Sequence, residues 1–328
     1  MPTAYCRLPT SNNCMMNRVH AIAPATVANV CCGFDILGFA VDAPGDEVVV
    51  TRTEKAGVEL IKITGDGGRL PMEANRNTAS VAIQSYLAAI CRNDVGVTVE
   101  LHKKLPLGSG MGSSAASAVA ALVAINHLMG EPFTRIELLP HAMEAERIAC
   151  GAAHADNVAP SLLGGFVLIR DYHPLDVVKV PTTLALYATL VHPQLEVKTE
   201  DSRKILRSTL SLRDTITQCG NVAGLMVGLS TADAALIGRS LKDVIAEPVR
   251  SVFIPGFEEV REQAKNAGAL GSGISGSGPT LFALSTSYEI AQHVGESIQE
   301  VFRRHLLASE VFISKINQDG ARVINYEL

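Results

Sequence analysis

Residues 104–120 read K-L-P-L-G-S-G-M-G-S-S-A-A-S-A-V-A, a glycine loop that runs directly into an alanine-rich segment. Gly108, Gly110 and Gly112 alternate with other residues, and glycine adopts the positive φ angles that let a backbone approach a ligand closely. The N–H groups from Ser113 to Ala116 would follow as the unpaired donors of a helix N-terminus, which binds anions. The stretch predicts a phosphate-binding loop, and the alternative is a structural glycine turn before a buried helix.

The loop is of neither common nucleotide-binding type. It lacks the Lys that follows the last Gly of G-x-x-x-x-G-K-[S/T], and its glycine spacing is not that of G-x-G-x-x-G. Residues 271–276 do match G-x-G-x-x-G, but they lie between an expected helix and an expected strand. A dinucleotide site needs the opposite order, strand then helix, so NAD binding is disfavoured.

Size and charge narrow the classes of partner. The chain has 328 residues, of which 47% are hydrophobic, enough for two cores and therefore two domains. The net charge is −5 and no Lys/Arg run exceeds residues 103–104, which argues against nucleic acid and against an anionic membrane surface. The longest apolar run, 118–125, is too short to span a bilayer. A cytoplasmic protein with a small-molecule partner is expected, and its seven cysteines, which form no C-x-x-C pair, should be reduced.

The periodicity of the chain predicts two α+β domains after an N-terminal extension. Residues 1–17 show neither strand nor helix periodicity and are expected to be disordered; Met15 or Met16 is an alternative start. The first domain, 18–174, should hold strands at 19–22, 47–52, 59–64, 96–101 and 166–170 and helices at 78–90, 113–128 and 140–149. The second, 175–328, should hold strands at 184–191, 279–285 and 311–316 and helices at 202–212, 222–230 and 257–266.

Three stretches in order resemble the motifs of the GHMP small-molecule kinases. They are P-A-T-V-A-N-V-C-C-G-F-D at 24–35, the glycine loop at 106–117, and A-L-G-S-G-I-S-G-S-G-P-T-L-F-A at 269–283. The resemblance implies a ribosomal-protein-S5-like N-terminal domain, a ferredoxin-like α/β sandwich as C-terminal domain, ATP and Mg²⁺ as cofactors, and a homodimer. It places ATP on Pro106, Leu107, Gly108, Ser109, Gly110, Met111, Gly112, Ser113, Ser114, Ala115 and Ala116, with Asn77 near the adenine.

Residues 154–166, H-A-D-N-V-A-P-S-L-L-G-G-F, narrow the resemblance to one GHMP family, the homoserine kinases. It implies ATP-dependent phosphorylation of L-homoserine to O-phospho-L-homoserine, for threonine biosynthesis. The ammonium of this zwitterion needs a carboxylate, and its carboxylate suits a planar guanidinium. The expected substrate-binding residues are Asn29, Asp35, His154, Asp156, Asn157, Thr199, Arg203 and Arg250.

The same resemblance assigns the metal and the catalytic groups. Glu146 lies eight residues before His154, as the magnesium-binding Glu of the family does, and Ser114 is favoured over Ser113 as its partner. One carboxylate and one hydroxyl suffice for Mg²⁺, which also takes phosphate and water ligands. Asn157, with Glu146 and Ser114, is expected to act in catalysis without a dedicated base, since phosphoryl transfer relies on positioning and charge neutralisation.

Two alternative functions remain open, and one stretch of the sequence departs from the family pattern. Another GHMP kinase acting on an alcohol such as mevalonate would not need both an ammonium site and two arginines. A non-catalytic ligand sensor of the same fold would lack the metal carboxylate. Cys31 and Cys32 stand where the family usually has Gly-Pro, so the rigidity of that loop is an open point.

Overall fold

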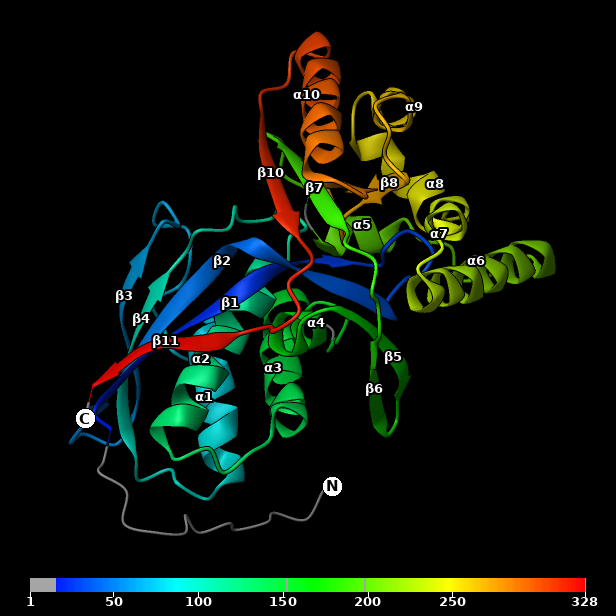
Figure 1. Ribbon diagram of the computed structural model, residues 1–328. Helices are drawn as coiled ribbons and strands as arrows, with labels where there is room; N and C mark the ends of the chain where they lie inside the picture. The colour runs from blue at the N-terminus through cyan, green and yellow to red at the C-terminus, as the bar shows by residue number, and fades with distance from the viewer. Residues whose placement is uncertain (1–15, 152, 198, 328) are drawn as a thin grey trace.

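The computed structural model describes residues 16–151, 153–197 and 199–327, and it contains two β-sheets with helices packed on them (Figure 1). Residues 1–15 of the expected disordered extension lie outside this range. Asn17, which was expected to belong to that extension, is ordered. Its N–H donates to the carbonyl of Glu327 at 2.8 Å and its carbonyl accepts from Arg52 at 2.9 Å.

The first sheet has the strand order β11-β1-β2-β4-β3, with β5 paired to β2 and β6 paired to β5. All described pairs are antiparallel except β3 with β4. The strands are β1 (Arg18–Ala28), β2 (Leu37–Thr53), β3 (Gly57–Thr64), β4 (Gly96–His102), β5 (Phe166–Tyr172), β6 (Leu175–Val180) and β11 (Arg322–Glu327).

Helices cover one face of this sheet (Figure 1). They are α1 (Thr78–Ala89), α2 (Ser113–Leu128), α3 (Arg135–Cys150) and the short α4 (Val158–Leu163). The central helix α2 packs on β1 and β2 and also against α1, α3 and α4. This explains its sequence, because a helix enclosed on all sides is apolar all round. Its expected bounds, 113–128, are confirmed.

The second sheet has the order β10-β7-β9-β8 and is antiparallel. Its strands are β7 (Tyr187–Pro193), β8 (Gly271–Ile274), β9 (Leu281–Ser285) and β10 (Ser309–Lys315). Its helices are α5 (Thr199–Lys204), α6 (Leu212–Thr231), α7 (Ala234–Ser240), α8 (Glu247–Arg250), α9 (Phe257–Asn266) and α10 (Tyr288–Arg304), with a 3₁₀ turn at Ser251–Phe253. The order of strands and helices is that of a ferredoxin-like fold, as expected.

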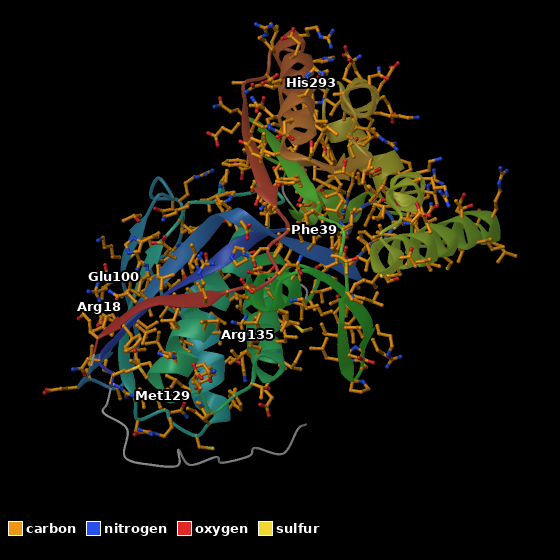
Figure 2. All side chains as sticks on the ribbon, viewed as in Figure 1. Arg18, Phe39, Glu100, Met129, Arg135 and His293 are labelled. Carbon is orange, nitrogen blue, oxygen red and sulfur yellow. The ribbon has the colours of Figure 1, made fainter. Side chains whose placement is uncertain are left out.

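The chain passes between the lobes more than once, which a single boundary at residue 174 does not describe. Residue 174 falls inside the β5–β6 hairpin of the first sheet, and β11 returns from the second lobe to pair with β1. The two sheets meet at Phe39 of β2, which Figure 2 labels at the junction. The Phe39 ring lies 4.9 Å from that of Phe166 and 5.9 Å from that of Phe282 in the second sheet.

The structure corrects one further expectation and confirms another. The helix expected at 202–212 is interrupted, because α5 ends at Lys204 and α6 begins at Leu212, where the Ser211 side chain caps it. The G-x-G-x-x-G stretch opens the β8–β9 hairpin instead of joining a strand to a helix, which excludes the dinucleotide arrangement. Among the described residues, none of the helices has the length and apolarity needed to cross a membrane.

Candidate active site

A cavity of about 430 Å³ opens where the glycine loop, the first motif, residues 154–157, α5 and the third motif meet. Most of the residues expected to bind ATP or substrate line it. They are Asn29, Asp35, Asn77, Leu107, Gly108, Ser109, Gly110, Gly112, Ser113, Ser114, Glu146, His154, Asp156, Asn157, Arg203 and Arg250. The fold thus brings together residues that span more than two hundred positions in sequence.

The glycine loop has the backbone that its sequence predicts. Gly108, Gly110 and Gly112 all have positive φ, between 65° and 78°. Gly112 is the N-cap of α2 and offers no side chain to cap it, and Ser113 and Ser114, the first residues of the helix, line the cavity. One expectation fails here: the N–H of Ala116 donates to the Gly112 carbonyl at 2.8 Å, since it already belongs to the helical ladder.

The third motif packs against the loop from the second lobe. The Ser275 hydroxyl donates to the Gly110 carbonyl at 2.7 Å, and the Thr280 N–H donates to the Ser109 carbonyl at 3.1 Å. A Cβ atom on Gly110 would lie 2.3 Å from the Ser275 carbonyl oxygen. The contact between these two segments therefore requires glycine at position 110.

The first motif turns sharply through three consecutive residues with positive φ, Asn29, Val30 and Cys31. The side chain of Asn29 holds this turn, because its Oδ1 accepts from the Asp35 N–H and its Nδ2 donates to the Gly276 carbonyl, both at 3.0 Å. Both ends of the expected substrate-binding amide are therefore engaged within the protein. Cys31 and Cys32 are buried and free.

Asp35 and Arg203 form a bidentate ion pair across the cavity. Arg203 Nη1 lies 3.0 Å from Asp35 Oδ2, and Nη2 lies 2.9 Å from Oδ1. Both side chains are partly exposed and line the cavity. The two groups expected to bind the opposite ends of the substrate are thus paired with each other here.

Arg250 is more deeply placed than Arg203. It is buried, and its Nη1 donates to the Gly276 carbonyl at 2.9 Å while its Nε donates to the Ser202 carbonyl at 3.2 Å. Both guanidinium groups lie over the Phe34 ring, at 5.6 Å for Arg203 and 5.2 Å for Arg250. Burial lowers the pKa of Arg250 from its usual value, and the charge of Arg203 adds to this.

His154 and Asp156 lie beside the ion pair. His154 Nδ1 is 3.7 Å from Asp35 Oδ2, and burial lowers the pKa of the imidazole. Asp156 is buried, and burial together with the Asp35 charge raises its pKa to about 7. This end of the cavity therefore holds a carboxyl group, Asp156, that exchanges a proton near neutral pH.

Glu146 of α3 is buried and faces the N-terminus of α2, where the Ser114 side chain hydrogen-bonds to it. Burial raises the pKa of Glu146, while Ser114 and the charge of Lys103 oppose that rise. The neighbouring Ser113 hydroxyl is also buried, and no described residue hydrogen-bonds to it. A carboxylate and a hydroxyl at a helix N-terminus form a donor set suited to Mg²⁺ beside a phosphate.

A buried ion pair that was not expected from the sequence lies beneath the loop. Lys103 bonds to Asp46, to the Ser113 carbonyl at 2.8 Å and to the Ser117 hydroxyl at 2.8 Å. Burial lowers the pKa of Lys103, and Asp46 opposes this. Asp46 Oδ1 also accepts the N–H groups of Lys104 and Leu105, which fixes the entry to the loop. The adjacent basic pair Lys103–Lys104 was the available signal.

Some residues that were expected to bind ATP or substrate make other contacts or lie outside the cavity wall. Asn77 caps α1, since its Oδ1 accepts the Ala79 N–H at 3.1 Å, and its Nδ2 donates to the Pro71 carbonyl at 3.3 Å. Thr199 begins α5, and its side chain lies outside the described part. Pro106, Met111, Ala115 and Ala116 are not among the residues that line the cavity, and the last three are buried. Residues that line it but were not anticipated include Leu70, Pro71, Arg76, Thr78, Lys103, Ser117, Ile148, Gly276 and Ser277.

Comparison with known proteins shows the family of this chain. The family models of the GHMP kinase N-terminal and C-terminal domains match residues 77–165 and 225–304. The chain belongs to the GHMP kinases.

Within that class the similarity is to homoserine kinases. The homoserine kinase of Chlorobium phaeobacteroides strain BS1 is 51% identical over 94% of this chain and 100% of its own length. That of Chlorobium phaeovibrioides is 50% identical over the same shares. The crystal structure of homoserine kinase from Cytophaga hutchinsonii is 53% identical, with a TM-score of 0.92 over 96% of this chain and 100% of that one. The chain is a member of the homoserine kinase family.

Proposed function

We propose that this kinase transfers the γ-phosphoryl group of ATP to the side-chain hydroxyl of L-homoserine. The observation that carries the proposal is the Asp35–Arg203 pair, which sets an anion and a planar cation at the cavity wall a short distance from the glycine loop. An α-amino acid presents the complementary pair of charges. Its ammonium would take the place of Arg203 at Asp35, and its carboxylate would take the place of Asp35 at Arg203.

The glycine loop would hold the phosphates of ATP through the uncapped N–H groups at the start of α2. Ser114 and Glu146 are the residues that would hold Mg²⁺, which supplies charge neutralisation for the phosphates when bound. Asn157, which lines the cavity, would orient the substrate hydroxyl. A loose transition state needs positioning and charge stabilisation more than a strong base, so no residue is assigned as base.

Further parts of the proposal follow the family. We propose a homodimer and a cytoplasmic location. Asn77 would contribute to the adenine pocket through its place in the cavity wall, although its amide is engaged as a helix cap. Arg250 would support the substrate carboxylate together with Arg203, since the two guanidinium groups share the Phe34 ring.

The test measures the rate at which ADP is released from Mg²⁺-ATP in the presence of each of several alcohols. L-homoserine should be turned over, while 4-hydroxybutyrate, which lacks the ammonium, and 3-aminopropan-1-ol, which lacks the carboxylate, should each lose roughly 100-fold or more in kcat/KM. A ligand with a single charge leaves Asp35 or Arg203 without its partner in a partly buried site. Mevalonate should be a poor substrate for the same reason.

Arg203→Ala is the matching variant. It should raise the KM for L-homoserine by roughly 10- to 100-fold, because a charge-assisted pair with the substrate carboxylate is lost, and leave the KM for ATP close to that of the wild type. Arg207→Ala, an exposed arginine of the same segment, is the control and should change neither. Equal turnover of L-homoserine and mevalonate would overturn the substrate assignment, and no turnover of any alcohol would favour the sensor alternative.

A further inference from the structure

Thr26 lies in β1 and belongs to the first motif. It has no part in the binding and catalytic roles proposed so far. We propose that Thr26 is a positioning residue: its hydroxyl fixes the side-chain amide of Asn157 so that the NH₂ end faces the reacting atoms. The inference rests on the proposed function, in which Asn157 orients the substrate hydroxyl.

The contact is direct and partly buried. The Thr26 hydroxyl donates to Asn157 Oδ1 at 2.8 Å, across 131 positions of sequence. Thr26 is fully buried, and its own N–H donates to the Met111 carbonyl of the glycine loop at 3.1 Å. Its backbone is also in register with Ala40 of β2. Thr26 therefore sits on a rigid strand that is tied to the phosphate loop.

Asn157 is placed to use this contact. It occupies the N-cap position of α4, where an Asn side chain commonly caps the helix, but it makes no such hydrogen bond. Its side chain instead turns toward Thr26 and the cavity. Asn157 therefore makes a hydrogen bond at the site in place of the usual helix-capping hydrogen bond.

Gly112 restricts the pair further. A Cβ atom at Gly112 would lie 2.1 Å from the Thr26 hydroxyl oxygen and 2.9 Å from Asn157 Oδ1. The hydroxyl and the amide oxygen thus pack directly against the backbone of the N-cap of α2. Three separate segments, β1, the glycine loop and α4, meet at this hydrogen bond.

The chemistry explains why the orientation matters. An amide has an acceptor end and a donor end, and a hydroxyl that donates to Oδ1 leaves Nδ2 as the end available to the cavity. The substrate hydroxyl oxygen and the phosphoryl oxygens carry lone pairs and, during transfer, negative charge. A donor beside them stabilises the transition state, whereas an amide turned by 180° would present an oxygen and repel them.

The first experiment compares Thr26→Val with Thr26→Ser. Val keeps the shape of the side chain and removes the hydroxyl, so the amide loses its fixed orientation. We expect kcat with L-homoserine to fall about tenfold, the loss of one hydrogen bond at the transition state, with the KM for ATP within about twofold of wild type. Ser keeps the hydroxyl and should restore kcat to within about threefold. Thermal unfolding of each variant checks that the fold is retained.

A double-mutant cycle with Asn157→Ala separates positioning from a structural effect. If Thr26 acts through Asn157, adding Thr26→Val to Asn157→Ala should lower kcat no further. A further tenfold loss in that background, or a Thr26→Val variant with wild-type kcat, would overturn the inference. A wild-type chain that does not phosphorylate L-homoserine at all would overturn the proposed function and this inference together, so the two failures are distinguishable.

Discussion

At the scale of single residues, burial next to the site sets the protonation of several carboxyl groups. Glu247 begins α8 behind the first motif, and its Oε1 accepts the Ile274 N–H at 2.8 Å. Burial raises its pKa to about 7, and the hydrogen bond from Ile274 only partly opposes this. In the unfolded chain its pKa would be about 4.3. The folded state therefore binds a proton at Glu247 that the unfolded state releases between these two values.

The residue-scale prediction is that Glu247→Gln reduces the pH dependence of stability. In the wild type, the folding stability that the neutral Glu247 side chain contributes is fully present below about pH 4 and is lost as the pH rises through about 7. Gln keeps the hydrogen-bond acceptor and carries no charge. The fall in Tm between about pH 5 and pH 8 should thus be smaller for the variant, measured by calorimetry. The exposed Glu262→Gln is the control, and an equal pH dependence in wild type and Glu247→Gln would contradict the account.

At the scale of elements, the glycine loop is held by two lobes at once. Its entry is fixed by Asp46 in the first lobe, and its tip packs on the third motif of the second. Long, periodic elements such as α2 could be read from the sequence, because their apolar pattern records a continuous buried environment. Short elements could not: α5 and α8 have six and four residues, too few for a periodic signal. Residues 288–304, now α10, were given no element although they bury one face.

The element-scale prediction compares two glycines with similar backbone angles. Gly110 (φ 78°) lies against the Ser275 and Gly278 carbonyls, whereas Gly130 (φ 81°) has open space where a Cβ would be. Each Ala substitution should cost about 1–2 kcal/mol of left-handed strain. Gly110→Ala should in addition separate the loop from the third motif and raise the KM for ATP by about tenfold or more. If Gly130→Ala raises the KM for ATP equally, backbone strain alone explains the rise and the contact with the third motif does not.

At the scale of the whole molecule, α6 projects from the second lobe and leaves an apolar stripe uncovered (Figure 1). Leu212, Ile216 and Val227 are 76%, 63% and 51% exposed, and they share one helix face with the exposed Cys219 and Ala223. Large residues stand at both ends of the stripe and small ones at its centre. Two antiparallel copies paired through this face would make an isologous contact, which is one arrangement for the proposed homodimer.

The whole-molecule prediction is a dimer that depends on this stripe. Light scattering should give twice the chain mass for wild type and the single mass for Ile216→Glu. Leu306→Glu, which replaces a 94% exposed leucine elsewhere, should leave the dimer intact. Because Cys219 lies near the centre of the stripe, mild oxidation should cross-link the dimer, and Cys219→Ser should abolish the cross-link. A wild-type protein of single mass would show that the stripe does not pair copies of this chain.

The sequence by itself determined the α+β class, the phosphate loop, the position of α2 and the family, because these depend on local backbone preferences and on short motifs. Only the tertiary structure decided that Asp35 pairs with Arg203 and that Thr26 contacts Asn157. The same holds for the side-chain amides of Asn29 and Asn77, which hydrogen-bond within the protein. The tertiary structure also decided that β6 and β11 belong to the first sheet. Such contacts join residues distant in sequence, and no local pattern records which partner a polar side chain or an edge strand meets.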